Sequence, residues 1–373
     1  MFRFWTEGTQ EAEDFCTILV GLLSESTQGA ADPNELLRIA ARIRGGNRED
    51  WVESFAAEGK RLCTIAETAA GCSHQRTAGE SYLRAFTYFR CAELMLPPTD
   101  PRKAALYDQT ISCFPLGLNY AGYLYEAISI PWEGRQLAGW LFKPAENEGV
   151  STPCVIFLSG ADALPEQNFF RGVQWLTARG LACLLLNGPG QGGAIRLQGL
   201  TTVPDYERPV TAAVNYLLGR GDIDGNRLGL MGVSMGGYYV MRAAAFEHRF
   251  RGIVVWGAMY SIYEDLWQHY PPLRPQLRWI TGSKDDADAA TKLSTFTLKG
   301  LLENVRTPVL IVHGAKDEMV PLDSAQRTFN ELRISDKQLH IYRANDGGER
   351  HINIDNWSQV IPSMADWLVE RLR

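Results

Sequence analysis

Apolar positions in the first third of the chain recur at the spacing of an α-helix. One series runs over residues 36–43 and another over residues 82–94, with apolar side chains three or four positions apart, as on the buried face of a helix. Asp32-Pro33 offers an N-cap and a first-turn proline ahead of the first series. A cluster of prolines ends the second series, namely Pro97, Pro98 and Pro101. The pattern predicts a mostly helical region up to about residue 120.

After that point the pattern changes to short apolar runs separated by helical stretches. Residues 123–130 and 137–142 alternate around Glu133-Gly134, which predicts an antiparallel hairpin. Continuous apolar runs, typical of strands buried on both faces of a parallel sheet, follow at Cys154–Leu158, Leu181–Leu186, Leu228–Met231, Ile253–Trp256 and Val309–Val312. Helices are predicted at Tyr206–Leu218, Tyr238–Phe246, Ala325–Leu332 and Trp357–Leu372. The predicted fold class is α/β, with a mostly parallel central sheet flanked by helices and an N-terminal all-helical domain.

The alternation fails between Glu264 and Leu301, where several prolines precede the charged run DDADAATK. That stretch is longer than an ordinary sheet connection, and such insertions often form lids or binding loops. A surface excursion without a catalytic role is the alternative. We expect two domains, a helical one over residues 1–120 and an α/β one over residues 121–373 with a lid-like insertion at about 264–301.

Composition excludes several classes of protein. The 373 residues are 45% hydrophobic and 21% charged, as in globular proteins of about two domains. The 37 basic and 43 acidic side chains leave a net charge of −6, so nucleic acid and membranes are not expected partners. No apolar run reaches the ~18 residues of a membrane span, and acids interrupt the N-terminus where a signal peptide would be apolar. We expect a cytoplasmic protein.

The seven cysteines are odd in number and lack CxxC spacing. This usage favours reduced, buried thiols over a disulfide framework or a zinc site. We therefore expect no metal ion, and the cysteines concerned are Cys16, Cys63, Cys72, Cys91, Cys113, Cys154 and Cys183.

The motif Gly232-Val233-Ser234-Met235-Gly236 lies between a predicted strand, LGLMG, and a predicted helix, YYVMRAAAF. In this setting the serine adopts a strained backbone and exposes its Oγ at the carboxyl edge of the sheet. The helix that follows favours negative charge at its N-terminus. A glycine-rich turn with an incidental serine is the alternative. Ser234 is the predicted nucleophile.

A serine nucleophile needs a base, and the base needs an orienting carboxylate. In this kind of fold the chain order is serine, acid, histidine. Asp317 follows the predicted strand PVLIVHG, and His351 ends the polar loop NDGGERH after the strand at 338–342. Glu318 would point the opposite way in an extended loop, and Asp346 is a weaker alternative acid. The other histidines lie in strands or outside the expected order: His74, His248, His269, His313 and His340.

Two backbone amides are expected to bind the oxyanion that forms on the substrate. One belongs to Met235, which follows the nucleophile. The other comes from the loop Ser159-Gly160-Ala161-Asp162 after the strand at 154–158, and we assign it to Ala161.

The run Gly188-Pro189-Gly190-Gln191-Gly192-Gly193 matches the GxGxxG fingerprint of dinucleotide sites. That fingerprint requires a helix to begin immediately, whereas AIRLQGLTTVPD contains no clear helix before Pro204, and this is not the first βα unit of the region. We interpret the run as a tight loop near the pocket and expect no cofactor.

These motifs make the chain from about residue 123 resemble the α/β-hydrolase superfamily. More narrowly, it resembles the two-domain group that includes 2,6-dihydroxypseudooxynicotine hydrolase and the fungal polyketide-shortening hydrolases of pigment synthesis. The resemblance rests on SGADALPE, NGPGQGG followed by DYERPVTAAV, GVSMGG with VVWGAMYS downstream, HGAKDEMVP and GGERH. The helical region ahead of the core matches the group as well, so the resemblance covers nearly the whole chain.

The resemblance implies a serine hydrolase that cleaves a carbon–carbon bond beside a ketone, in a site between the core and a helical cap. It also implies an auxiliary acid after the strand that follows the nucleophile. Glu264 is our assignment there, although Asp265 and a solvated acid without a role remain open. The expected partner is a small molecule, aromatic or polyketide-like, such as an aryl ketone or β-diketone. Aromatic residues near the helical region could line its pocket, although most should be core: Tyr82, Phe86, Tyr88, Phe89, Tyr120 and Tyr123.

Three alternatives stay open at this point. The first is an esterase, lactonase or thioesterase with the same triad. The second is a biosynthetic cyclase or isomerase that uses the histidine as its base, and the third is a non-enzymatic scaffold or receptor. The helical domain could also mediate a homodimer.

Overall fold

The computed structural model describes residues 10–145 and 151–373 and divides the chain into two compact units, Met1–Leu124 and Tyr125–Arg373. The first nine residues, on which the argument about a signal peptide partly depends, lie outside the described residues. Among the helices described, none is long and apolar enough to cross a membrane.

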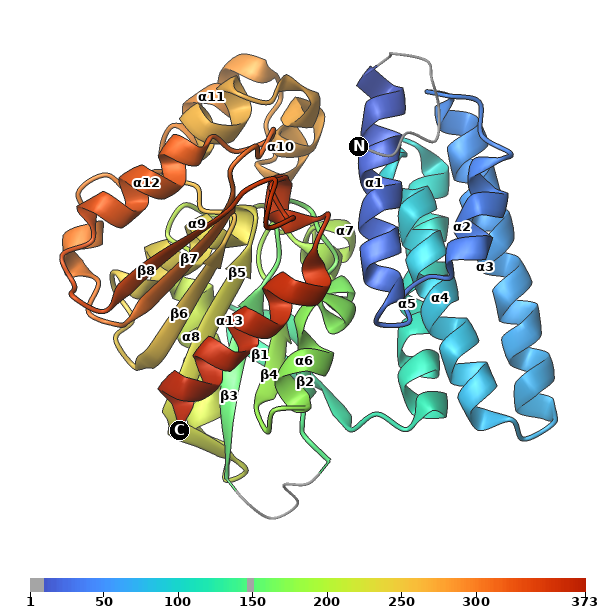
Figure 1. Cartoon of the computed structure of the whole chain (residues 1–373), viewed down its shortest axis with the longest axis horizontal. Helices are drawn as coiled ribbons and strands as arrows, with labels where there is room; N and C mark the ends of the chain where they lie inside the picture. The colour runs from blue at the N-terminus through green and yellow to red at the C-terminus, as the bar shows by residue number, and fades with distance from the viewer. Residues whose placement is uncertain (1–9, 146–150) are drawn as a thin grey trace. The chain divides into compact units, whose positions relative to one another are not determined.

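The N-terminal unit is helical, as its apolar periodicity predicts. Asp32 caps the second helix by accepting hydrogen bonds from the amides of Asn34 and Glu35, and α4 packs between α3 and α5 (Figure 1). Most of the aromatic residues considered for a pocket are core, since Tyr82, Phe86, Tyr88 and Phe89 are buried. The helices of this unit are α1 Gln10–Ser26, α2 Pro33–Ala40, α3 Arg48–Gly71, α4 Gln75–Leu94 and α5 Pro101–Ala121.

The C-terminal unit is built on an eight-stranded sheet in the order β1-β2-β4-β3-β5-β6-β7-β8. The strands are β1 Tyr125–Trp132, β2 Arg135–Phe142, β3 Thr152–Leu158, β4 Ala182–Leu186, β5 Ile223–Val233, β6 Phe250–Trp256, β7 Val309–Gly314 and β8 Lys337–Tyr342. The pairs β1–β2 and β2–β4 are antiparallel and the remaining pairs are parallel. Glu133 and Gly134 form the hairpin turn, both with positive φ, which matches the strand twist.

Helices cover both faces of this sheet, which explains its continuous apolar strands (Figure 1). On one face lie α6 Gln174–Thr177 and α13 Trp357–Leu372. On the other lie α8 Glu207–Leu218, α9 Met235–Ala244 and α12 Leu322–Glu331, which share one apolar core with β3, β5 and β6. Strands β3, β4 and β7 are buried along their whole length. The predicted fold class is thereby confirmed.

The insertion at about 264–301, for which the sequence predicted a lid or binding loop, contains helices. A π-helical segment, η3 Tyr263–Gln268, leads into α10 Arg274–Ile280 and α11 Asp286–Leu293. Leu277 and Leu293 belong to the main apolar core. Packing of these apolar positions therefore stabilises the insertion, despite its prolines and charged residues.

Candidate active site

Ser234 occupies the sharp turn between β5 and α9. Its backbone lies at φ 57° and ψ −124°, a strained conformation for a residue with a side chain. A Cβ on Gly232 would come within 2.2 Å of the Gly236 carbonyl oxygen, so only glycine allows this approach of strand and helix. The amide of Ser234 donates to the carbonyl of Trp256 at 2.7 Å, which ties the turn to β6. The serine side chain is thus presented at the carboxyl edge of the sheet.

Three residues predicted from distant parts of the sequence form one hydrogen-bonded chain. His351 Nε2 lies 3.0 Å from Ser234 Oγ, and His351 Nδ1 lies 2.8 Å from Asp317 Oδ2. When Nδ1–H donates to the carboxylate, Nε2 holds the lone pair that can accept the serine proton. The second oxygen of Asp317 accepts from the amides of Met319 and Val320 at 2.9 and 2.8 Å. The carboxylate is therefore held in one orientation toward the imidazole.

Asp317 and His351 each stabilise the charged form of the other. Burial works against the charged form of His351, but the charge and hydrogen bond of Asp317 outweigh it, so the pKa of His351 is raised above its ordinary value of 6.5. Burial works against the charged form of Asp317 as well, and His351 outweighs it in turn, so the pKa of that carboxyl is lowered from 3.8. The pair therefore favours a carboxylate that stabilises an imidazolium.

The histidine loop is strained and is held by residues that the sequence did not single out. Ile352 and Asn353, which follow His351, both have positive φ. The buried side chain of Asn353 accepts from Trp256 Nε1 at 2.9 Å and donates to the carbonyl of Gly348. Trp357 Nε1 donates to the carbonyl of Ile352 at 2.7 Å. Only the positive-φ tolerance of asparagine offered a sequence signal, and it was too weak to identify the loop.

The rejected acids have other partners. Glu318 pairs with Arg350 at 2.6 Å and also accepts weakly, at 3.4 Å, from the backbone amide of His351. Asp346 is exposed and accepts from the amide of Arg343. Neither carboxylate is hydrogen-bonded to the His351 ring, whereas Asp317 is.

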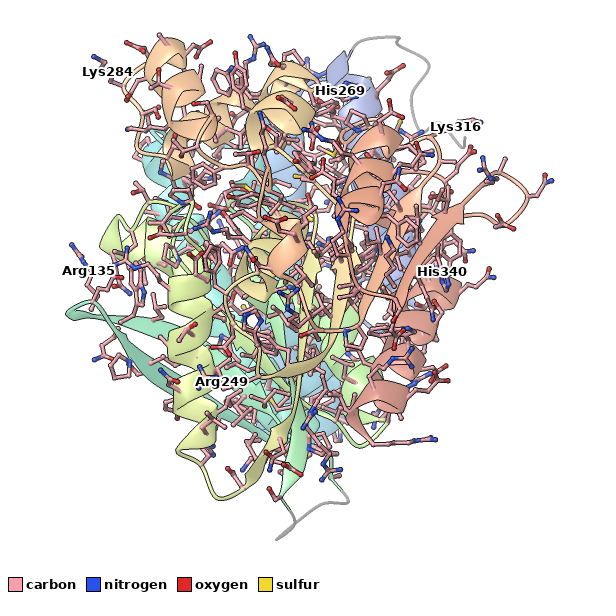
Figure 2. All side chains as sticks on the ribbon, turned by 90° about the vertical axis from the view of Figure 1, so that its left-hand side faces the viewer. Arg135, Arg249, His269, Lys284, Lys316 and His340 are labelled. Carbon is pink, nitrogen blue, oxygen red and sulfur yellow. The ribbon has the colours of Figure 1, made fainter. Side chains whose placement is uncertain are left out.

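Of the other described histidines, only His313 lies close to the hydrogen-bonded Ser234, His351 and Asp317. His313 is fully buried, with Nε2 3.1 Å from the carbonyl of Val320 and 3.7 Å from Asp317 Oδ2. Burial lowers its pKa, although the charge of Asp317 acts in the opposite direction. His74 and His248 are exposed, as are His269 and His340, which are labelled in Figure 2.

Of the two amides predicted for the oxyanion, one directly follows Ser234, and the other follows a glycine that borders it. Met235 is the first residue of α9, so its N–H has no acceptor within the helix. A Cβ on Gly160 would lie 3.2 Å from Ser234 Cβ and 3.5 Å from Oγ, which places the loop before Ala161 against the nucleophile. Ala161 itself is half-buried, and the backbone hydrogen bonds of the described residues include none that its amide donates.

The structure does not bring Glu264 into this network. Its exposed carboxylate pairs with Arg327 at 3.3 Å, whereas the neighbouring Asp265 is buried and accepts from the amides of Tyr260 and Ser261. Burial raises the pKa of Asp265. Glu264 is therefore a surface acid in these contacts, and Asp265 caps the turn that opens the insertion.

The glycine-rich run after β4 needs a correction. A helix, α7 Gly192–Gln198, begins at the last two residues of the run, where the sequence indicated no clear helix before Pro204. The run is nevertheless filled by the protein's own atoms, because a Cβ on Gly188 would lie 2.1 Å from the hydroxyl of Tyr206, and residues 188–195 are buried. Close packing against Tyr206 therefore requires glycine at position 188. Within the described parts of the chain no cluster of three His, Cys, Asp or Glu could hold a metal ion.

A mostly parallel sheet with flanking helices and a strand–serine–helix turn defines an α/β-hydrolase. The chain belongs to the prolyl oligopeptidase family, whose family model matches residues 167–373. It is 27% identical to hydrolase LUC6 of a Fusarium species, over 94% of both chains. It is 26% identical to the 20-hydroxy-prefusarin hydrolase FUS2 of Gibberella moniliformis, over 91% of both chains.

A solved structure shares the fold over almost the whole length. The 2,6-dihydroxy-pseudo-oxynicotine hydrolase superimposes with a TM-score of 0.83, covering 94% of this chain and 95% of its own, at 21% identity. The helical N-terminal region is thus part of a shared architecture. The chain is an enzyme of the α/β-hydrolase type.

Proposed function

We propose that this protein is a serine hydrolase in which Ser234, His351 and Asp317 form the catalytic triad. One observation carries the proposal: His351 is hydrogen-bonded to both Ser234 Oγ, at 3.0 Å, and Asp317 Oδ2, at 2.8 Å. The serine, the base and the orienting acid are thus already within reach of one another before any substrate binds.

In the first half-reaction Ser234 Oγ attacks the substrate carbonyl carbon while its proton moves to His351 Nε2. The amides of Met235 and Ala161 donate to the oxyanion of the tetrahedral intermediate. Collapse of that intermediate breaks the bond to the leaving group, whose electron pair takes the proton from His351. An acyl ester of Ser234 remains.

In the second half-reaction His351 removes a proton from water, and the resulting hydroxide attacks the acyl ester. The tetrahedral intermediate collapses, the carboxylic acid leaves, and Ser234 Oγ recovers its proton from His351. Asp317 stabilises the imidazolium in both halves without itself taking a proton.

The substrate we propose is an aryl ketone, a β-diketone or a related polyketide-like small molecule, cleaved at the carbon–carbon bond beside the carbonyl. The resemblance carried by GVSMGG, HGAKDEMVP and GGERH supports this choice, and the name of the relative 20-hydroxy-prefusarin hydrolase supports a small organic substrate. A carbanion leaves in this reaction, so the bond must be next to a second carbonyl or an aromatic ring that delocalises the charge. Protonation of the leaving carbon falls to His351.

The test has two stages on the full-length protein. A fluorophosphonate probe should label Ser234, identified by mass spectrometry of the modified peptide, and should not label the Ser234→Ala variant. The wild type is then assayed with an aryl ester, an aryl β-diketone and a peptide anilide, and the acids released are quantified. The proposal expects turnover of the β-diketone that Ser234→Ala abolishes.

The outcomes separate the alternatives. Turnover of the aryl ester alone would replace carbon–carbon hydrolysis with an esterase, and turnover of the anilide alone would indicate a peptidase. Conversion of a substrate that persists in Ser234→Ala would rule out covalent acyl transfer and favour a cyclase or isomerase that uses His351 as its base.

A further inference from the structure

The segment that follows β4 holds the loop that carries Ala161. Gln191 Nε2 donates to the carbonyls of Ser159 and, at 3.2 Å, Gly160. Two further carbonyls of the loop accept from the same segment: that of Asp162 from Arg196 Nη1 at 2.8 Å, and that of Ala163 from the amide of Gly192 at 3.0 Å. The carbonyls on both sides of Ala161 are therefore held from one side.

The bond to Gly160 fixes the direction of the next amide. The described chain contains no cis peptide, and in a trans peptide the carbonyl oxygen and the N–H point in opposite directions. Since the Gly160 carbonyl points at Gln191, the Ala161 N–H points away from Gln191. Gly160 itself borders Ser234, because a Cβ there would lie 3.5 Å from Ser234 Oγ.

Gln191 is itself held in one orientation. Its side chain is fully buried, and Oε1 accepts from the hydroxyl of Tyr206 at 3.3 Å. That hydroxyl also reaches the carbonyl of Pro189 at 3.2 Å. The Tyr206 ring stacks on Tyr239 with centroids 3.6 Å apart and planes 13° apart. With Oε1 directed at Tyr206, both N–H groups of the side-chain amide are left for the loop.

We propose that Gln191 is a positioning residue for the oxyanion hole: its side-chain amide locks the Gly160–Ala161 peptide so that the Ala161 N–H faces the oxyanion formed at Ser234. This inference rests on the proposed function. Gly160 has no side chain to restrain its peptide, and a flipped peptide would present a carbonyl oxygen to the oxyanion. Gln191 opposes the flip because its buried side-chain amide would then lose the Gly160 carbonyl as an acceptor.

The test compares oxygen and sulfur at the reacting carbonyl. Kinetics are measured on the full-length protein with an aryl ester and the matching thionoester, whose sulfur accepts hydrogen bonds weakly. Gln191→Met removes both donors at similar length, and Gln191→Glu keeps the shape while removing donors. Gln198→Met is the matched control, since Gln198 on the exposed part of α7 also donates to a backbone carbonyl, that of Gln136, at 3.1 Å.

Loss of one aligned oxyanion donor is worth about 100-fold in kcat. We therefore expect kcat for the ester to fall by about that factor in Gln191→Met, with KM nearly unchanged, and the thionoester rate to change much less. The ester-to-thionoester ratio should thus collapse in Gln191→Met and Gln191→Glu but not in Gln198→Met. A purely structural role would lower both rates equally and leave the ratio intact, which would overturn the inference.

Two results must be kept apart. If Ser234→Ala retains the ester activity, the proposed function fails and the inference fails with it. If the ester activity depends on Ser234 but either soluble, folded Gln191 variant keeps the wild-type ratio, only the role of Gln191 is overturned. Because the two variants perturb the buried site in different ways, one polar and one apolar, either one that folds decides the question.

Discussion

Trp256 connects the nucleophile to the histidine loop through a single hydrogen bond to Asn353, from indole Nε1 to Oδ1 at 2.9 Å. The carbonyl of the same tryptophan accepts from the amide of Ser234 at 2.7 Å. Trp256, at the end of β6, is therefore hydrogen-bonded both to Ser234 and to the loop that carries His351. Asn353 is fully buried and lies at φ 51°, so the loop has little freedom to re-form this bond elsewhere.

We predict that Trp256→Phe impairs catalysis beyond its cost in stability. The substitution leaves the buried Asn353 oxygen without its donor, which should lower the free energy of unfolding by roughly 1–3 kcal/mol. It should also lower kcat by more than about tenfold, because small misplacements of a base have large effects on rate. Thermal unfolding and steady-state kinetics measure the two effects.

Trp367→Phe is the matched control for that prediction. Trp367 is also buried, on α13, and its Nε1 has no hydrogen-bond partner among the described residues. This variant should lose packing energy while keeping kcat. Equal kcat in the two variants would contradict a role for the Trp256–Asn353 bond in holding His351.

Asp317→Asn should both slow the reaction and shift its pH dependence. An asparagine amide donates to Nδ1 and leaves the proton on Nε2, the wrong tautomer for a base, so kcat should fall roughly 10⁴-fold. Only neutral His351 can accept the serine proton, so wild-type kcat/KM should fall as the pH drops through the raised pKa of His351. Without the Asp317 carboxylate the pKa of His351 decreases. The pH at which kcat/KM falls on the acid side of its profile therefore moves to a lower value.

The pH profile of acylation and an NMR titration of the His351 ring measure this shift. Asp346→Asn is the control, because Asp346 was the alternative acid and is exposed beside Arg343. Its profile should match the wild type. A loss of activity in Asp346→Asn equal to that in Asp317→Asn would contradict the assignment of Asp317 as the acid that orients His351.

Glu318→Gln should tune the base without disabling it. Among the charges around His351, Asp317 raises its pKa most and Glu318 adds a smaller effect in the same direction. Removal of the Glu318 charge should move the acid limb of kcat/KM to lower pH and leave kcat on the plateau unchanged. Because the Glu318–Arg350 pair is partly exposed, stability should change by less than about 1 kcal/mol.

Glu349→Gln is the comparison for this prediction. Glu349 lies in the loop that leads to His351 but pairs with Lys316 at 3.1 Å, and it is not among the main groups that shift the pKa of His351. Its acid limb should stay in place. An identical shift in both variants would mean that the net charge near His351, not the position of Glu318, sets the pKa of His351.

The proximity of Ser234, Asp317 and His351 was predictable because each of them has a strong local signal. Ser234 lies in a glycine-flanked turn between a strand and a helix, and Asp317 and His351 follow the ends of later strands. Parallel strands bring their carboxyl ends to one edge of the sheet, so order along the chain translates into proximity. The apolar strand runs were equally readable because β3, β4 and β7 are buried on both faces.

Features that depend on tertiary contacts were not predictable. Helix α7 begins with two glycines, which are poor helix formers, and hydrogen bonds to the neighbouring loop hold it in place. Pro275 lies in the first turn of α10, where proline is compatible with a helix, so the prolines of the insertion do not exclude helices there. The choice between Glu264 and Asp265 turned on which of two adjacent side chains points inward.

A buried carboxyl group, that of Glu166, lies a few residues after Ala161 in the sequence. Glu166 is 3% exposed, and Oε1 accepts from Trp140 Nε1 at 2.8 Å and Asn187 Nδ2 at 3.3 Å. Among the described residues Oε2 has no hydrogen-bond partner. Burial raises the pKa of Glu166 above its ordinary 4.5, against the smaller opposing effects of its own backbone amide, the hydrogen bonds from Trp140 and Asn187, and the charge of Arg196. The folded protein therefore favours the neutral acid more than the unfolded chain does.

The sign of the stability effect follows from proton binding. At pH values between the pKa of Glu166 in the unfolded chain and its higher pKa in the folded protein, the native state binds more protons than the unfolded chain does. Glu166 therefore contributes stability below pH 4.5 that is lost as the pH rises. Glu166→Gln removes this loss and keeps an oxygen acceptor for Trp140. The variant should gain stability over the wild type as the pH rises from 4.5 through the raised pKa of the folded protein, measured by urea unfolding at a series of pH values. Exposed Glu303→Gln should show no such trend, and a pH-independent difference for Glu166→Gln would mean that the carboxyl ionises as freely in the folded protein as in the unfolded chain.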